Sequence, residues 1–349
     1  MSLLDKIKKN STIDQSSVLS KSKFFSEKDM IQTYVPMMNV ALSGSLEGGL
    51  TPGVTMFAGP SKHFKTAFSL LLAKSYLEKY EDAVLLFYDS EFGTPISYFD
   101  TFEIDKERVL HTPLTDIEQL KFDLMAQLTN LERGEKLIII IDSIGNLASK
   151  KEVEDALDQK AVADMTRAKQ VKSLFRMITP HLTLKDIPLV VVNHTYKEIG
   201  MFPKDIVGGG TGSYYSADNI FIIGRQQEKE GTEIVGYNFI INVEKSRYVK
   251  EKSKIPVTVS FEGGINKFSG LLEVAIEGGF VVKPSNGWYS KVDLETGEVL
   301  KEKVRIADTQ NAKFWTSILE SDKFKQYIKQ RYEVAYGSIL ETEKETEEA

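Results

Sequence analysis

The sequence predicts an α/β fold built around a mostly parallel, twisted β-sheet. Five short apolar runs recur along the first two thirds of the chain, at residues 54–59, 83–89, 137–142, 188–193 and 219–224. Runs that are apolar throughout are typical of strands covered on both faces, as in parallel sheets. Between the second and third runs, apolar side chains from Ile117 to Leu131 recur three or four residues apart, which predicts the crossover helix that parallel strands require.

The sequence predicts four parts. We expect residues 1–30 to form a short N-terminal arm and residues 31–284 to form the core. Within the core, the extended segments after residue 224 predict antiparallel strands added to the sheet. Residues 285–340 predict a small C-terminal α/β domain, with a hairpin that turns at 295–297 and amphipathic helices after it. Residues 341–349 contain five glutamates, a composition that predicts a disordered acidic tail.

Composition excludes several classes of protein. The 349 residues include no cysteine and only four histidines, which excludes disulfides, thiolate catalysis and cysteine metal sites and argues against a histidine metal site. The N-terminus is too polar for a secretory signal, and no apolar run approaches the roughly 20 residues that cross a bilayer. We therefore expect a soluble, intracellular protein without a membrane partner. The net charge of -6 neither indicates nor excludes nucleic-acid binding, because such binding depends on local patches of basic residues.

The segment GPSKHFKT, between the first strand and the next helix, predicts a phosphate-binding loop. Gly59, Lys65 and Thr66 match the pattern G-x-x-x-x-G-K-[ST], whereas Phe64 replaces its second glycine. The amides of such a loop and the helix N-terminus face an anion. Lys65 would reach the β- and γ-phosphates of ATP, and Thr66 would hold Mg²⁺. An ordinary strand-to-helix turn is the alternative. The candidate nucleotide-binding residues are Gly59, Pro60, Ser61, Lys62, His63, Phe64, Lys65 and Thr66.

Carboxylates follow two further strands. Asp142 ends the third apolar run and is placed to support Mg²⁺, although such an aspartate is often only a turn or helix cap. Glu91 follows the second run and could orient an attacking water, the alternative being an exposed charge. Because the carboxyl ends of parallel strands share one edge of a sheet, we expect these residues to meet Lys65 and Thr66 in one site.

Longer strings resemble one family. GPSKHFKT, LFYDSEFG, IIDSIGNLASKKE, DMTRAKQVKSLFR, NHTY and VGGGTG together resemble the UvsX recombinases of T-even-like bacteriophages, phage members of the RecA-type strand-exchange family. The resemblance runs from about residue 20 to residue 335. It implies a RecA-like P-loop ATPase core that uses ATP and Mg²⁺, and filaments on single-stranded DNA that pair with homologous double-stranded DNA and exchange strands. A phage recombination mediator and a single-strand-binding protein are the implied partners.

The resemblance also implies roles for single residues. UvsX-type proteins carry a loop of this irregular form, so Phe64 does not argue against nucleotide binding; we expect its φ to suit the loop and its ring to pack outward. Lys65, Glu91 and His194 are the implied catalytic residues. His194 stands where a γ-phosphate sensor, usually glutamine, is found, although a lone histidine there is more often structural. The N-terminal arm is implied to dock on the next subunit for oligomerisation.

Three more residues are implied to contact nucleotide. Tyr98 corresponds to the residue that stacks on adenine, its alternative being helix packing. Lys245 and Arg247 are candidates to reach the nucleotide of a neighbouring subunit, their alternative being a surface ion pair.

Two segments have the character of DNA-binding loops. Residues 149–163 are polar and predicted to be helix-poor, and residues 196–215 form a long glycine-rich connection. Either would ordinarily be a solvated loop, but the resemblance favours salt-dependent contacts to the DNA backbone, with Tyr214 or Tyr215 stacking on a base. The candidate DNA-binding residues are Lys150, Lys151, Arg167, Lys169, Lys197, Lys204, Gly208, Gly209, Gly210 and Tyr214.

Two other functions stay open from the sequence. A hexameric DNA helicase with a RecA-type core shares the loop and the sheet, but forms closed rings. A non-hydrolysing, nucleotide-gated assembly protein is favoured if Phe64 blocks catalysis.

Overall fold

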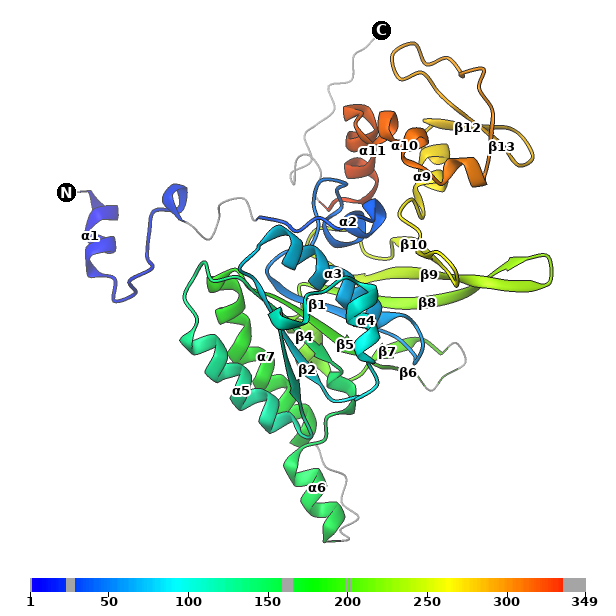
Figure 1. The fold of residues 1–349 in the computed structure, drawn as a ribbon. Coiled ribbons are helices and arrows are strands. Elements are labelled where there is room, and N and C mark those ends of the chain that lie inside the picture. The colour runs from blue at the N-terminus through cyan, green and yellow to red at the C-terminus, as the bar shows by residue number, and fades with distance from the viewer. Residues whose placement is uncertain (1, 23–28, 159–165, 199, 201–202, 335–349) are drawn as a thin grey trace.

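The computed structural model describes residues 2–22, 29–158, 166–198, 200 and 203–334. Within these residues a nine-stranded sheet forms the centre of the molecule, with helices on both faces (Figure 1). The C-terminal helices and short strands lie together at one end of this core, and the N-terminal helix α1 (Leu3–Asn10) stands away from it. None of the helices described is both long and apolar enough to cross a membrane.

The large sheet has the order β11-β10-β9-β8-β1-β5-β4-β2-β3. Strands β1, β2, β4, β5 and β8 coincide with the five apolar runs, and the pairings among β1, β5, β8, β4, β2 and β3 are parallel. Strands β9, β10 and β11 add in antiparallel fashion, so the predicted fold class is confirmed. The bounds are β1 Gly53–Ala58, β2 Val84–Asp89, β3 Val109–Pro113, β4 Leu137–Asp142, β5 Pro188–Asn193, β8 Asn219–Glu230, β9 Glu233–Lys245, β10 Lys254–Ser260 and β11 Gly264–Ile265.

Successive strand residues point into two separate cores. In β4, Ile138 and Ile140 pack on the side of α2 (Pro36–Ser43) and α3 (Lys65–Lys79). Ile139 and Ile141 pack on the opposite side, against α5 (Ile117–Asn130) and α7 (Thr166–Lys185). Burial on both faces explains why these strands are apolar throughout rather than alternating.

The segment 149–163 was predicted to be helix-poor, and that prediction is wrong for its first half. Residues Lys150–Leu157 form helix α6, which begins with a capping box: the Ser149 hydroxyl accepts the Glu152 amide at 3.1 Å, and Glu152 accepts the Ser149 amide at 3.3 Å. These two contacts satisfy amides that a helix start leaves unpaired. Residues 159–163 lie outside the described residues.

The other core elements are short. Helix α4 (Ile96–Thr101) follows β2, and the hairpin of β6 (Thr195–Lys197) and β7 (Asp205–Val207) leads into α8 (Thr211–Ser216). The 3-10 turns are η1 Leu19–Lys21, η2 Lys106–Arg108, η3 Ile144–Asn146 and η4 Ala307–Thr309.

The C-terminal elements gather around the buried Trp315, whose indole N–H donates to the Thr309 carbonyl at 2.6 Å. The predicted turn at 295–297 is present, because the Gly297 amide donates to the Asp293 carbonyl at 2.9 Å. The bounds are α9 Leu271–Glu277, β12 Val281–Ser285, β13 Trp288–Lys291, β14 Val304–Arg305, α10 Ala312–Leu319 and α11 Asp322–Tyr332. The predicted boundary at residue 285 stays a prediction, and the predicted tail lies outside the described residues.

Candidate functional site

A cleft of about 430 Å³ opens where β1, β2 and β5 end at the same edge of the sheet. Residues 61–67, which follow β1, line one side of the cleft. Phe239 and Phe261 also line it, and these aromatic side chains were not predicted from the sequence. The expected site residues that line the cleft are Ser61, Lys62, His63, Phe64, Lys65, Thr66, Glu91, Tyr98 and His194.

The loop 59–66 is shaped by close approaches and by its own lysine. A Cβ at Gly59 would lie 3.1 Å from the carbonyl oxygen of Ile223, so the glycine lets the loop pass the neighbouring strand. The buried ammonium of Lys65 donates to the Pro60 carbonyl at 2.8 Å, which folds the loop over it. Burial lowers the pKa of Lys65, against the opposing influence of Glu91 and Asp142. Such an ammonium is well placed for an anion.

Thr66 and Asp142 meet across the loop, as predicted. The Thr66 hydroxyl donates to Asp142 Oδ2 at 2.6 Å. Asp142 Oδ1 is buried without a hydrogen-bond partner among the described residues, and burial raises the pKa of this carboxyl to about 6. An unpaired carboxylate oxygen beside a hydroxyl fits a hard cation such as Mg²⁺, which binds through one or two carboxylates and substrate phosphates. Among the described residues, no group of three or more histidine, aspartate or glutamate side chains is arranged to hold a metal ion.

Glu91 and His194 form a hydrogen-bonded pair, with 2.8 Å between Glu91 Oε1 and His194 Nε2. The turn that carries Glu91 is fixed by Asp89, whose Oδ1 accepts the amides of Glu91 at 3.0 Å and Phe92 at 2.8 Å. The contact with His194 is the main cause that lowers the pKa of Glu91. Glu91 is therefore an ionised carboxylate at neutral pH, as a proton acceptor must be.

Asn193, which the sequence did not predict, joins His194 to the glycine segment. Its Oδ1 accepts the His194 amide at 2.9 Å and its Nδ2 donates to the Gly208 carbonyl at 2.8 Å. The Gly208 amide in turn donates to the His194 carbonyl at 2.9 Å. Asn193 is fully buried at the end of β5. A polar residue at the end of an otherwise apolar strand is the sequence feature that could have indicated its role.

The rest of the glycine segment lies partly open. Gly209 and Gly210 have φ of 88° and 75°, a left-handed conformation that glycine takes without strain. Lys197 pairs with Asp205 at 2.9 Å across the hairpin. Tyr215 is 73% exposed, whereas Tyr214 is partly buried. Tyr215 is therefore the more accessible of the two candidate stacking residues.

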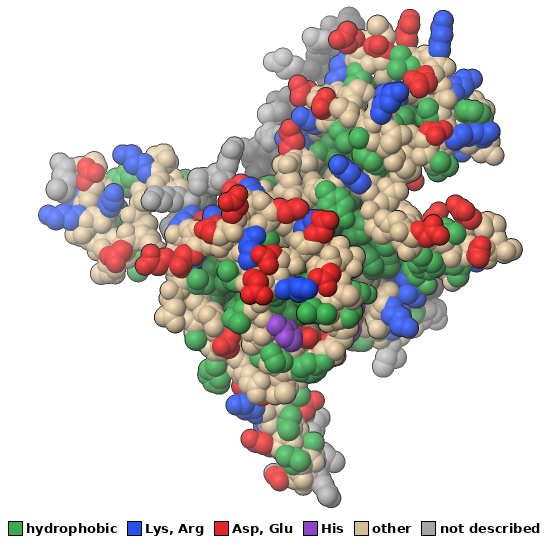
Figure 2. All heavy atoms as spheres, viewed as in Figure 1, with side chains coloured by type: hydrophobic (Ala, Val, Ile, Leu, Met, Phe, Trp, Pro, Cys, Tyr) green, Lys and Arg blue, Asp and Glu red, His purple; other side chains and the backbone are tan. Residues whose placement is uncertain are grey.

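The first predicted DNA segment is tied to the core. The Arg167 guanidinium donates to the carbonyls of Ile144, Gly145 and Leu147 at 2.6–3.0 Å. Lys151 pairs with Asp155 at 2.7 Å on α6. These contacts show Arg167 supporting the loop after β4, and DNA contact by Lys150, Lys151, Arg167 and Lys169 stays a prediction. On the face drawn in Figure 2, acidic and basic side chains are interspersed, and the described residues on this face show no continuous basic groove.

Lys245 and Arg247 contact their own chain. Lys245 Nζ donates to the carbonyls of Tyr214 at 2.9 Å and Tyr215 at 3.1 Å, and Arg247 pairs with Asp218. Burial lowers the pKa of Lys245. Both side chains thus brace the glycine segment and the start of β8 within one subunit, and their role towards a neighbouring nucleotide stays a prediction.

Phe64 differs from expectation in one respect. Its φ of 60° suits the loop, as predicted, but the ring stacks on Phe239 of the same chain with 5.0 Å between centroids. The expected outward packing is wrong, because a buried aromatic surface lies beside the loop. Arg225, which the sequence did not predict, supports the same loop by donating to the Lys62 carbonyl at 3.1 Å.

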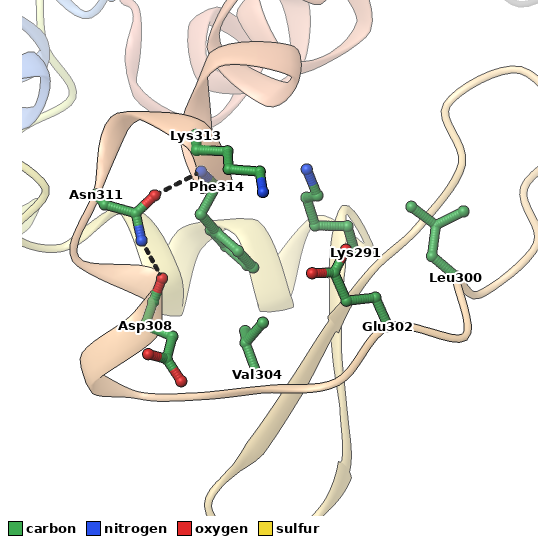
Figure 3. A pocket seen from close by; sticks show the side chains of 8 residues that line it. All are labelled: Lys291, Leu300, Glu302, Val304, Asp308, Asn311, Lys313 and Phe314. Carbon is green, nitrogen blue, oxygen red and sulfur yellow. Dashed lines mark hydrogen bonds between the residues drawn. The ribbon is translucent and has the colours of Figure 1, made fainter.

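A second hollow of about 350 Å³ lies among the C-terminal elements (Figure 3). Its lining combines the apolar side chains of Leu300, Val304 and Phe314 with charged and polar side chains, which are those of Lys291, Glu302, Asp308, Asn311 and Lys313. None of the predicted site residues lines it, so it is separate from the strand-end cleft.

Comparison with known proteins agrees with this site. The family model of the RecA N-terminal domain matches residues 3–266. The chain belongs to the RecA family. The C-terminal part of this RecA-family chain, residues 268–328, matches a model described as "Bacteriophage T4, Recombination and repair protein, C-terminal domain". The resemblance predicted from the sequence is therefore confirmed.

This RecA-family chain is also similar to individual phage and bacterial proteins. It is 52% identical to the "Recombination and repair protein" of Enterobacteria phage T4, over 95% of this chain and 86% of that protein. It is 25% identical to "Protein RecA" of Tropheryma whipplei (strain Twist), over 76% of this chain and 60% of that protein. With "Protein RecA" of Paenarthrobacter aurescens (strain TC1), identity is 24% over 78% of each chain.

Proposed function

We propose that this RecA-family protein is an ATP-dependent DNA recombinase that forms filaments on single-stranded DNA and exchanges strands with homologous duplex DNA. One observation carries the proposal: Asn193 links the Glu91–His194 pair in the nucleotide cleft to Gly208 in the candidate DNA segment. A site built in this way can couple the state of a nucleotide to contact with DNA. The T4 relative named "Recombination and repair protein" supports the same function.

Binding of ATP would rest on the loop 59–66. Lys65 neutralises phosphate charge, the loop amides donate to phosphate oxygens, and Tyr98 packs against the base. Thr66 and Asp142 would hold Mg²⁺, since they leave a buried carboxylate oxygen unpaired. A bound Mg²⁺ supplies further neutralisation of the phosphate charge that develops during hydrolysis.

Hydrolysis would use Glu91 as the proton acceptor. The carboxylate orients a water for in-line attack on the γ-phosphorus; as the new P–O bond forms, the bond to the ADP oxygen breaks and the water proton passes to Glu91. The low pKa of Glu91 keeps it ionised for this step. Lys65 stabilises the charge on the γ-phosphate.

His194 would report the state of the site. The imidazole binds Glu91 here, and a γ-phosphate offers it a competing acceptor. Because the His194 amide and carbonyl are bonded to Asn193 and Gly208, a shift of His194 moves the root of the β6–β7 hairpin. DNA contact by Lys197, Lys204, Gly209, Gly210 and Tyr214 or Tyr215 would then depend on nucleotide.

Assembly would involve the N-terminal arm and a neighbouring subunit. We propose that the arm docks on the next core and that Lys245 and Arg247 contribute to the next nucleotide. The mediator and single-strand-binding partners and the host cytoplasm belong to the same proposal. Neither a ring helicase nor a non-hydrolysing assembly protein is favoured by the similar proteins, which include the T4 "Recombination and repair protein".

The test is ATP hydrolysis by the purified protein with Mg²⁺, with and without single-stranded DNA, beside Lys65→Ala. We expect DNA to stimulate turnover and the substitution to abolish it, because the loop loses its buried cation. A matched control is Lys79→Ala, at the far end of the same helix. Wild-type protein that shows no turnover in either condition would contradict the proposal.

A further inference from the structure

The phosphate loop is left-handed at two residues that are not glycine. Lys62 has φ of 61° and Phe64 has φ of 60°. This conformation brings a Cβ close to the following carbonyl, so side-chain-bearing residues disfavour it, whereas glycine adopts it freely. Contacts outside the loop must therefore hold both residues.

Phe64 is held by two aromatic side chains. Its ring stacks on Phe239 of β9, with 5.0 Å between centroids and 20° between planes, and meets Phe68 of α3 edge-on at 5.4 Å and 78°. Phe68 and Phe239 also meet edge-on, at 6.0 Å and 86°. Each ring thus contacts the other two in a favoured geometry. Since Phe68 and Phe239 are buried, they form a rigid surface on which the Phe64 ring packs.

Lys62 is held by the strand beside β9. Arg225 Nη1 of β8 donates to the Lys62 carbonyl at 3.1 Å, and the same guanidinium lies 4.8 Å from the Tyr237 ring centroid. Arg225 and Phe239 are paired residues in the β8–β9 ladder. One cross-strand pair therefore supports both left-handed residues of the loop.

We propose that Phe64 is a positioning residue that replaces the missing glycine: its ring, seated on Phe239, fixes the loop backbone in the shape that receives phosphate. Glycine would permit this shape, and the aromatic contact imposes it. Phe64 acts through the backbone of the loop rather than by touching the reacting atoms. The inference rests on the proposed nucleotide binding at this loop.

A double-mutant cycle tests the proposal. Phe64→Leu and Phe239→Leu each keep an apolar side chain but remove the ring contact. The measurement is the Kd of a fluorescent ADP analogue with Mg²⁺. We expect each single variant to raise the Kd about three- to tenfold. The Kd of the double variant should be no higher than that of the single variant that binds the analogue more weakly, because both substitutions remove the same ring contact. Independent effects that multiply, or single variants with wild-type Kd, would overturn the proposal.

Two controls separate positioning from general stability. Tyr327→Leu removes a ring contact with Phe280, at 5.7 Å, among the C-terminal elements, and we expect it to leave the Kd unchanged. Thermal unfolding is measured for every variant; a lower Tm with unchanged Kd would mean that the rings only stabilise the fold, which overturns the proposal. A wild-type protein that fails to bind the analogue would contradict the proposed function itself, whereas normal wild-type binding with unchanged variants would contradict the positioning role alone.

Discussion

At the scale of single residues, Glu91 is held by contacts on both its backbone and its side chain. Asp89 accepts its amide, and the His194 imidazole contacts its carboxylate at 2.8 Å. These contacts fix the direction of the carboxylate before any nucleotide arrives and keep it ionised through a lowered pKa. A side chain that is both oriented and ionised meets the two requirements of a general base.

Replacing Glu91 by glutamine tests this role. We expect kcat for ATP hydrolysis to fall by about 10²–10⁴-fold, the usual contribution of a positioned base, while the Kd of an ADP analogue changes little. The measurement is steady-state hydrolysis beside equilibrium binding. Glu78→Gln is a matched control, since Glu78 is exposed and pairs with Lys74 on α3. Wild-type turnover in Glu91→Gln would remove Glu91 from the chemistry.

Some site residues could be predicted from the sequence and others could not. Lys65, Thr66 and Asp142 belong to short strings at strand ends. The contact between Thr66 and Asp142 follows from the shared edge of a parallel sheet. Arg225 contacts Lys62 across 163 positions of the chain, and no local pattern encodes such a pair. The direction of the Phe64 ring depends on Phe239 in the same way.

At the scale of elements, the β6–β7 hairpin is anchored at its base by the side chain of Asn193. This side chain bonds to the backbone of His194 on one side and Gly208 on the other. Under the proposed coupling, a change at His194 would pass through these two hydrogen bonds to Gly208 at the base of the hairpin.

Asn193→Ala removes this root contact. We expect the variant to bind ADP and to lose most of the stimulation that single-stranded DNA gives to hydrolysis, because the hairpin no longer follows His194. The comparison is the ratio of turnover with and without DNA. Asn130→Ala is a control: Asn130 is the last residue of α5, and its amide donates to a carbonyl of that helix. An unchanged ratio in Asn193→Ala would contradict the coupling.

Two elements show where sequence patterns were insufficient. Strand β3 was not predicted, because its residues are half-buried or exposed at the edge of the sheet and it lacks an apolar run. The segment that forms helix α6 was predicted to be helix-poor because its composition is polar. Ser149 and Glu152 nevertheless form a capping box at the start of this helix. The spacing of Ser149 and Glu152 is the sequence signal that marks this helix start.

At the scale of the whole molecule, helix α1 has no buried residue and exposes Leu3, Leu4 and Ile7. An amphipathic helix without a place in its own core is suited to packing on another subunit. The arm and the core together would then build the filament that strand exchange requires.

Deletion of residues 1–28 tests this assembly. We expect the shortened protein to bind the ADP analogue normally but to form no filaments on single-stranded DNA, as seen by sedimentation and electron microscopy. The nucleotide site lies wholly in the remaining residues, so binding controls for correct folding. Filaments of normal length from the shortened chain would contradict the role of the arm.

Recombinase activity is tested most directly by a strand-exchange assay with the full chain, Mg²⁺ and ATP, using single-stranded DNA and either a homologous or an unrelated duplex. We expect joint molecules with the homologous duplex, none with the unrelated duplex, and none when Lys65→Ala replaces the wild-type protein. ATP hydrolysis and DNA binding without any homology-dependent joint molecules would contradict the proposed recombinase function.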